Sequence, residues 1–235
     1  MTAGGPTAYD VAEHYDEPYF EDLADRYRRR NRFARTRIAN VFSLLPDVRG
    51  RRLIDIGCGM GTFAIEAAER GAAAVGIDPA AAAVRTARRV AGGTSGVHFI
   101  RADAAALPLA NGSTDVVLAA DVTEHLDDDT LARILDESVR VLRPDGLLVL
   151  YTPEQSHLFE RLRDHGVLLK PDPSHIGVRS ATELAAAVRA VGLDVVALRH
   201  LPSHLPVWSV LERAFGRWVP LLRRRIGLVA RRTGG

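Results

Sequence analysis

The sequence predicts an α/β fold, a doubly wound and mostly parallel sheet of seven strands with helices on both faces. Beyond Pro46, short apolar runs alternate with helical stretches, a pattern typical of parallel strands joined by crossover helices. The 235 residues are 47% hydrophobic, which is enough for one sizeable core but little for two. We therefore expect a single sheet of this kind, preceded by a helical region.

Seven strands are expected, each a short run of mostly β-branched or other apolar residues bounded by turn residues. The predicted strands are Arg52–Ile56, Ala73–Asp78, Val97–Ala102, Asp115–Ala120, Leu147–Thr152, Asp194–His200 and Ile226–Arg231. The stretch between the last two, about residues 201–225, is longer than an ordinary connection and is interpreted as an inserted cap.

Helical spacing also precedes the first strand. Apolar residues recur with this spacing from Tyr9 to Leu45, and Pro46 ends the run. We therefore assign residues 1–45 to an N-terminal helical cap and residues 46–235 to the main domain.

Several helices carry recognisable end signals, namely glycine after the last turn, proline or acids at the first turn, and a capping box. The expected signals are Gly71 at the end of the helix after the first strand, Pro79 at the start of the next, acids at 127–129 before Leu131–Leu142, and Ser180-Ala-Thr-Glu183 opening a helix that Gly192 ends.

Charge and cysteine content narrow the class of protein. Lysine and arginine total 31 against 29 acids, a net charge of +2, and no aromatic-interleaved motif accompanies them, so we expect no nucleic acid partner. Two basic clusters, residues 26–37 and 213–232, are interpreted as arginines that cover helix surface, with membrane-surface contact as the alternative. The lone Cys58 excludes an internal disulfide, and the sequence shows neither a signal peptide nor a bilayer-spanning apolar run. These features predict a cytoplasmic protein.

The first predicted strand runs directly into the glycine-rich turn Gly57-Cys-Gly-Met-Gly61. Glycines let the backbone turn sharply and approach a ligand, and the following helix offers its unbonded N–H groups there. Such a turn suits any nucleotide. Asp55, just ahead of it, favours a cationic ligand such as S-adenosylmethionine (SAM), with its ammonium and sulfonium, over a pyrophosphate.

Two further strands end in acids that suit an adenosine. Asp78 follows the first glycine by about 20 residues, a position from which a carboxylate accepts from both ribose hydroxyls. Asp103 ends the third strand and is placed to accept from the adenine amino group. With Asp55, these acids favour SAM over a dinucleotide, and an NAD(P) oxidoreductase is the weaker alternative.

In this order the motifs resemble the class I SAM-dependent methyltransferases, closest to the broad group that includes ubiquinone-biosynthesis and natural-product O- and N-methyltransferases. The resemblance covers about residues 11–192 and implies a Rossmann-like fold whose last strand is antiparallel. Its segments are Leu53–Gly61, Val75–Asp78, Ala102–Ala104, Asp115–Leu118 and Leu142–Val149.

The resemblance also implies roles for single residues. Gly57 and Gly59 would line the methionine part of SAM, Asp78 would bind ribose, and Asp103 with Ala104 would frame adenine. Tyr15 would belong to a helix that closes over the cofactor. The full set of expected cofactor-binding residues is Tyr15, Asp55, Gly57, Gly59, Asp78, Pro79, Asp103, Ala104 and Asp121.

A second group of residues is expected at the same sheet edge, where open α/β folds bind ligands. Asp121-Val-Thr-Glu124-His125 follows the fourth strand, and His175 lies downstream. This pattern is similar to the metal site of plant small-RNA 2′-O-methyltransferases, with Asp121 standing where those enzymes have Glu. It implies Asp121, Glu124, His125 and His175 as ligands of Mg²⁺, Mn²⁺ or Zn²⁺.

Without a metal, His125 is interpreted as a general base or substrate-positioning residue, with Glu124 as its catalytic neighbour. A purely structural histidine is the third alternative. We expect methyl transfer from SAM to a hydroxyl of a small-molecule acceptor, and less readily to an amine or a carbon. The alternatives are a non-catalytic SAM-binding partner protein and a methyltransferase that acts on a lipid-linked or glycan acceptor.

The inserted cap, about residues 205–225, is expected to face the substrate. Pro206 begins an amphipathic helix and Pro220 ends it. The opposite interpretation, equally weighted, is that its apolar face packs on the sheet. That face comprises Trp208, Leu211, Phe215 and Trp218.

Overall fold

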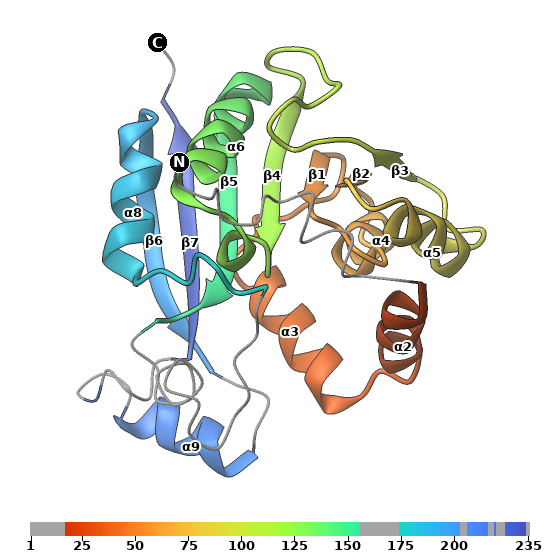
Figure 1. Cartoon of the computed structure of the whole chain (residues 1–235), viewed down its shortest axis with the longest axis horizontal. Helices are drawn as coiled ribbons and strands as arrows, with labels where there is room; N and C mark the ends of the chain where they lie inside the picture. The colour runs from red at the N-terminus through yellow and green to blue at the C-terminus, as the bar shows by residue number, and fades with distance from the viewer. Residues whose placement is uncertain (1–16, 156–173, 203–205, 216–218, 220–223, 234–235) are drawn as a thin grey trace, which may run out of the picture.

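The computed structural model describes residues 17–155, 174–202, 206–215, 219 and 224–233. Its centre is a seven-stranded sheet in the order β3-β2-β1-β4-β5-β7-β6 (Figure 1). The strands are β1 (Arg52–Ile56), β2 (Ala73–Asp78), β3 (Val97–Arg101), β4 (Thr114–Ala120), β5 (Leu142–Pro153), β6 (Leu193–Leu201) and β7 (Arg225–Arg232). The predicted fold is confirmed, and β5 alone begins well ahead of its predicted start.

Strand direction is that of a doubly wound fold. β1 pairs in parallel with β2 and with β4, and β4 pairs in parallel with β5. β7 lies between β5 and β6 and is antiparallel to both, which confirms the expected antiparallel last strand. The carboxyl ends of the six other strands therefore share one edge of the sheet.

Helices cover both faces of this sheet. Because successive side chains of a strand point to opposite faces, β1 contributes Leu53 to one buried cluster and Ile54 and Ile56 to the other. The first cluster lies under α3 (Arg32–Phe42), α4 (Thr62–Glu69) and α5 (Ala81–Ala91), the second under α6 (Asp128–Val141) and α8 (Ala181–Ala190) (Figure 1).

The helical run ahead of β1 is divided in two. α2 (Glu17–Arg28) ends before Arg30, whose φ of 42° lies in the left-handed region. Asn31 then caps α3, its side chain accepting from the Ala34 N–H at 2.9 Å. Apolar spacing alone missed this break because the signal is a single capping residue among arginines.

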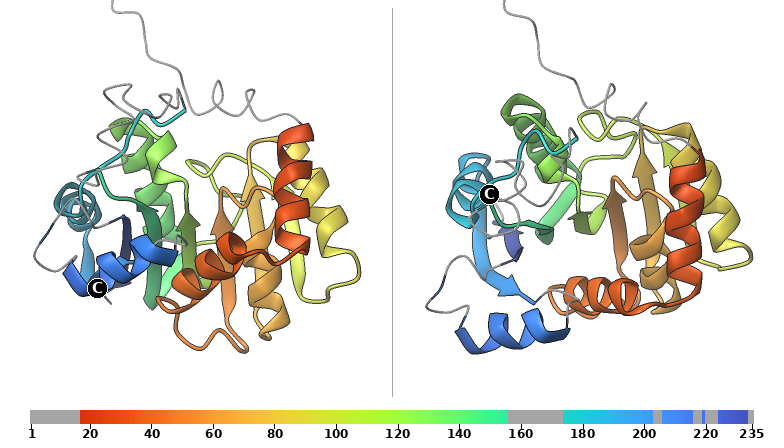
Figure 2. Two further views of the ribbon diagram at one scale, coloured as in Figure 1. Left: turned by 90° about the horizontal axis from the view of Figure 1, so that it is seen from below. Right: turned by 60° about the horizontal axis from the view of Figure 1, so that its bottom comes forward.

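α2 packs alongside α5 (Figure 2), and two exposed ion pairs join them, Arg85 with Glu17 and Arg89 with Glu21. The end of α2 is tied to α4 as well, since the Tyr27 hydroxyl donates to Glu66 at 3.1 Å. These contacts set α2 and α3 over the same edge of the sheet as the glycine-rich turn.

The remaining helix ends agree with their signals with one exception. Ser180 and Glu183 form the predicted capping box, and Gly71 takes the left-handed φ of 89°. Pro79 is the exception, because α5 begins at Ala81 with Ala80 as its cap, so that Pro79 precedes the helix. Its ring still fixes the backbone between Asp78 and the helix start.

The cap helix α9 (Pro206–Phe215) begins at the predicted proline. It lies beyond the carboxyl end of β6 and the start of β7, which share that edge of the sheet (Figure 2). Val210 and Phe215 are exposed, at 56% and 51%. Trp218 lies outside the described residues, as does the side chain of Trp208. None of the described helices has the length and apolar character needed to cross a membrane.

Candidate active site

A cavity of about 380 Å³ lies at the carboxyl edge of the sheet, a size within the range of small-molecule sites. It is bounded by the glycine-rich turn, the ends of β2 and β4, α2 and α3, and the segment that carries His175. All predicted site residues that the structure describes, except Asp55, line this cavity. Tyr15 lies outside the described residues.

The glycine-rich turn needs its glycines for two reasons. Gly57, Gly59 and Gly61 have φ values of 63°, 51° and 86°, which side chains strain to adopt. In addition, a Cβ at Gly57 would lie 2.5 Å from a methyl carbon of Val122. The turn therefore packs directly on the end of β4, and its backbone lines the cavity.

Asp78 ends β2 and is held by the turn and by the start of α5. Its two carboxylate oxygens accept from Gly59 N–H and Ala80 N–H, both at 2.9 Å. Burial raises its pKa, and these two hydrogen bonds oppose the rise. Each oxygen retains a lone pair for a ligand hydroxyl, so Asp78 is both fixed in place and able to accept.

Asp55 lies beneath the turn. It is 1% exposed, accepts from Ala64 N–H at 3.2 Å, and is not among the residues that line the cavity. Burial raises its pKa to about 8. In this conformation Asp55 holds the turn against α4, and direct contact with a ligand ammonium stays a prediction.

The end of β3 forms the far wall of this part of the cavity. Asp103 and Ala104 line it together with Pro79. Asp103 accepts from Ala105 N–H at 2.9 Å, a short-range turn that orients its carboxylate. These residues and Asp78 lie on neighbouring strand ends, as the order of motifs led us to expect.

Asp121, just past β4, is bonded to two arginines. Its carboxylate accepts from Arg37 of α3 and from Arg225 of β7, and its own φ is 58°. Burial disfavours its charge, but the two arginines outweigh burial and lower its pKa. The Asp121 carboxylate is therefore ionised and lies between the positively charged guanidinium groups of Arg37 and Arg225.

Arg37 and Arg225 both line the cavity, and sequence reasoning missed them. The guanidinium of Arg37 lies 5.3 Å from the ring centroids of both Phe33 and Phe63, within cation–π range. Their only sequence signal was membership of two basic clusters, which we interpreted as helix surface. Arg37 and Arg225 thus place two guanidinium groups beside Asp121 at this end of the cavity.

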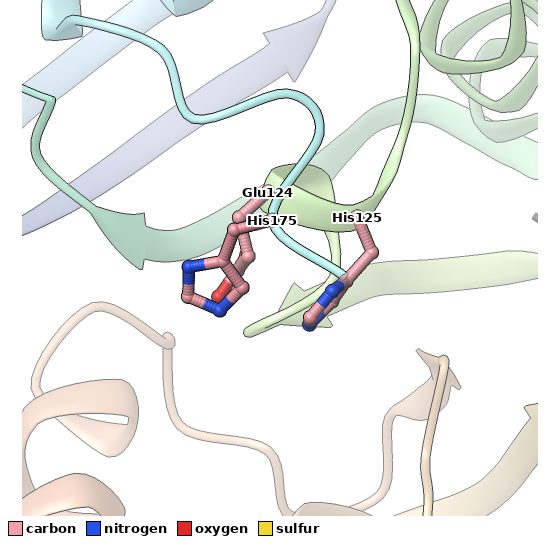
Figure 3. A group of neighbouring side chains, drawn as sticks. All are labelled: Glu124, His125 and His175. Atoms are coloured by element: carbon pink, nitrogen blue, oxygen red, sulfur yellow. The ribbon is translucent and has the colours of Figure 1, made fainter. Parts of the chain in front are cut away.

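Glu124, His125 and His175 lie together beside that end (Figure 3). Glu124 and His125 belong to the 3₁₀ turn η1 (Thr123–His125), and His175 comes from the segment before α8. One potential ligand atom from each lies within 4.8 Å of the others. Asp121, expected as a fourth metal ligand, is not part of this group in the described residues, because its carboxylate is bonded to the two arginines.

Hydrogen bonds define the chemical state of this group. His125 Nδ1 lies 2.9 Å from the Ser174 carbonyl oxygen, which can only accept, so Nδ1 carries the hydrogen and the lone pair of neutral His125 is on Nε2. The Thr152 hydroxyl donates to Glu124 at 2.9 Å. Burial, reinforced by the charge of Asp121, raises the pKa of Glu124 to about 7.

Comparisons with known proteins agree with this geometry. A family model described as methyltransferase domain matches residues 25–198. An uncharacterised methyltransferase of Mycobacterium bovis is 35% identical over 140 residues, which cover 54% of this chain and 54% of that protein. Another, from Mycobacterium sp. (strain JLS), is 41% identical over 101 residues, covering 43% and 38%. The chain thus spans about half the length, or less, of these curated relatives.

Solved structures share the fold at low identity. A methyltransferase solved in complex with the Haloferax volcanii Trm112 activator has a TM-score of 0.71 and 17% identity, covering 96% of this chain and 98% of that one. Geranyl diphosphate C-methyltransferase of Streptomyces coelicolor, solved with Mg²⁺, geranyl diphosphate and S-adenosylhomocysteine, has a TM-score of 0.64 and 19% identity, covering 83% and 76%. Since the family model matches most of the chain and the fold agrees, the chain belongs to the methyltransferase-domain family, within the class I SAM-dependent methyltransferases.

Proposed function

We propose that this protein transfers the methyl group of SAM to a hydroxyl of a small metabolite, with His125 as the general base. The observation that carries the proposal is that one cavity joins the glycine-rich turn and Asp78 to a histidine whose lone pair is on Nε2. The glycine-rich turn and Asp78 suit an adenosine-containing cofactor, and the histidine is suited to remove a hydroxyl proton.

The residues around the cavity fit SAM part by part. Asp78 accepts from the ribose hydroxyls, and Asp103 and Ala104 frame the adenine. The backbone of Gly57 and Gly59 lies along the methionine part. The carboxylate of that part would suit the guanidinium groups of Arg37 and Arg225, which line the same cavity. The other residues expected at the cofactor, Tyr15, Asp55, Pro79 and Asp121, stay predictions.

The protein contributes positioning and proton transfer. When bound, SAM supplies an electrophilic methyl group on its sulfonium. The cavity wall orients the acceptor oxygen toward that methyl group. Orienting two bound reactants in this way removes a large part of the activation free energy of their reaction. His125 would take the hydroxyl proton at Nε2 as the new carbon–oxygen bond replaces the carbon–sulfur bond, with S-adenosylhomocysteine as the leaving group. The Ser174 carbonyl would stabilise the resulting imidazolium through Nδ1–H.

A divalent metal is the second candidate, because Glu124, His125 and His175 bring two imidazoles and a carboxylate within ligand range of one another. This donor set suits Zn²⁺ or Mn²⁺ better than Mg²⁺, which prefers oxygen ligands and water. Asp121 would not serve as the fourth ligand without leaving its arginines. The metal would take the place of the base by lowering the pKa of the bound acceptor hydroxyl.

The helices ahead of β1 form a cap over the cofactor, since Phe20, Tyr27, Phe33 and Arg37 all line the cavity. No side chain of α9 that the structure describes lines it, so the role of that helix at the acceptor side rests on its place beyond the strand ends. The lone Cys58 supports a cytoplasmic setting.

The test is acceptor-dependent formation of S-adenosylhomocysteine from methyl-labelled SAM, with a panel of hydroxylated metabolites as acceptors. We expect labelled O-methyl product in equal amount to S-adenosylhomocysteine, also after exhaustive chelation. Loss of turnover on chelation, restored by Mn²⁺ or Zn²⁺, would establish the metal instead of the base. Tight SAM binding without acceptor-dependent turnover would favour a non-catalytic SAM-binding partner protein.

A further inference from the structure

The segment that carries His175, residues 174–180, lies against the turn that carries His125. Backbone groups of the two are bonded directly, since Gly177 N–H donates to the Glu124 carbonyl at 2.9 Å. The Ser174 carbonyl accepts from His125 Nδ1 on the same side. The position of this segment therefore decides where His175 lies and which tautomer His125 adopts.

Arg179 joins the two elements through every donor that it has. Its guanidinium carries five N–H groups. Nη1 donates to the Thr123 carbonyl at 2.9 Å and to the Gly177 carbonyl at 2.7 Å. Nη2 donates to the Leu126 carbonyl at 2.9 Å and to Asp128 at 2.6 Å, and Nε donates to the same Asp128 oxygen at 3.0 Å.

The hydrogen bonds of Arg179 are largely shielded from solvent. The side chain of Arg179 is only 10% exposed, whereas that of Asp128 is 92% exposed. The five bonds reach four acceptors, and three of these are backbone carbonyls: those of Thr123 and Leu126, on either side of Glu124 and His125, and that of Gly177. An exposed ion pair adds little, so the three carbonyl bonds carry the function of Arg179.

We infer that Arg179 is a positioning residue, which clamps residues 174–180 onto the turn Thr123–Leu126 and thereby fixes the Nδ1–H tautomer of His125 and the place of His175. This inference rests on the proposed function, in which Nε2 of His125 accepts the proton. Arg179 itself is not among the residues that line the cavity, so it acts through the two histidines.

Lysine cannot replace the planar guanidinium of Arg179. It has three donors on one rotatable nitrogen and cannot reach acceptors on residues 174–180 and on the turn Thr123–Leu126 at once. Gly177 offers a second way to separate the same elements. A Cβ there would lie 1.9 Å from the Leu126 carbonyl oxygen. The same Cβ would lie 2.8 Å from Nη1 of Arg179, so Gly177→Ala forces the segment away from the turn and disturbs the guanidinium as well.

The test is nuclear magnetic resonance on the full chain, saturated with S-adenosylhomocysteine, with no acceptor present. In the wild type, the ¹⁵N shifts of His125 should report hydrogen on Nδ1, and the Gly177 amide should be protected from exchange. In Arg179→Lys and in Gly177→Ala, we expect a mixture of His125 tautomers and at least about tenfold faster exchange of residue 177. Arg189→Lys, the same substitution at an exposed arginine of α8, should change neither.

Two controls separate positioning from general stability. Affinity for S-adenosylhomocysteine should stay within about twofold of wild type, because Arg179 does not line the cavity and contacts none of the residues proposed to hold this ligand. Asp128→Ala, which removes only the exposed acceptor, should retain the wild-type tautomer. An Nε2–H tautomer in the wild type, or a tautomer and amide protection that survive both Arg179→Lys and Gly177→Ala, would overturn the inference. The first of these results would also remove His125 as the base of the proposed reaction, whereas the second would leave the proposed reaction untouched; methyl transfer itself is tested separately, by acceptor-dependent formation of S-adenosylhomocysteine.

Discussion

The two ends of the cavity bury their carboxylates in opposite ways. At the glycine-rich end, Asp55 and Asp78 accept from backbone N–H groups, form no ion pair among the described residues, and have pKa values raised by burial. At the opposite end, which we propose receives the acceptor and call the acceptor end, Asp121 lies between Arg37 and Arg225, which outweigh burial and lower its pKa. A bound cation would therefore stabilise the charges of the first end, whereas the charge of Asp121 at the second end is already compensated.

This difference teaches how the cavity is prepared for its ligands. A buried carboxyl without a fixed cation has its charge stabilised when a cationic ligand arrives. A carboxylate already held by two arginines keeps its charge whether or not a ligand is bound. SAM carries cationic groups that suit the first end, and at the second end we propose that neutral His125 takes the proton that leaves the acceptor.

The largest expected effect is at the acceptor end. His125→Ala should lower turnover about 10²- to 10⁴-fold, because the acceptor hydroxyl loses its base, while SAM affinity stays nearly unchanged. Acceptor-dependent formation of S-adenosylhomocysteine and calorimetry measure the two quantities. His200→Ala is the matched control, since His200 pairs with Glu154 and does not line the cavity. An equal loss of SAM affinity in His125→Ala would remove the distinction between the two ends.

The next effect concerns pH and the glycine-rich end. The pKa of Asp55 rises from 3.8 to about 8 on folding. A group with a raised folded pKa contributes stability that is complete below the unfolded value and is lost as pH rises through the folded value. We therefore expect the contribution of Asp55 to fall between about pH 4 and pH 8, at about 1.4 kcal/mol per unit of pKa difference.

Asp55→Asn isolates this contribution, because asparagine still accepts from the Ala64 N–H but cannot ionise. The free energy of unfolding of the variant, minus that of the wild type, should increase from pH 4 to pH 8. Chemical denaturation at several pH values measures it. A difference that is constant across this range would mean that Asp55 is ionised in the folded protein throughout.

A smaller effect is expected for the ribose contact. Asp78→Ala should weaken SAM binding at least about tenfold, since hydrogen bonds to a charged group contribute about 1.5–3 kcal/mol each. Asp103→Ala should do less, because adenine is also held by apolar contact. Calorimetry that returned wild-type affinity for Asp78→Ala, with the fold intact, would contradict the ribose assignment.

The strand, the turn and the strand-end acid of the glycine-rich end lie where the sequence predicted them, because these features are local. Strand, turn and strand-end acid follow one another, and Asp78 bonds to Gly59 only 19 residues away. The same holds for the capping box at Ser180 and the start of α9 at Pro206. Such features depend on backbone conformation and hydrogen bonds within a few turns, which residue type and spacing reveal.

The acceptor end could be predicted only in part because its contacts are long-range. Asp121 meets Arg37 across 84 residues and Arg225 across 104, and His125 meets Ser174 across 49. Arginines in basic clusters look the same in sequence whether they cover a helix or line a cavity. Asp121 therefore seemed available as a metal ligand, and Arg179 carried no signal at all.

The most direct measurement is a crystal structure of the protein with S-adenosylhomocysteine, collected so that anomalous scattering reveals any transition metal. We expect the ribose hydroxyls on Asp78 and the sulfur facing His125, with Nδ1 of His125 still on the Ser174 carbonyl and no ion between Glu124, His125 and His175. A sulfur that faces away from His125, or a metal ion bound by those three residues, would contradict a histidine base at the acceptor end.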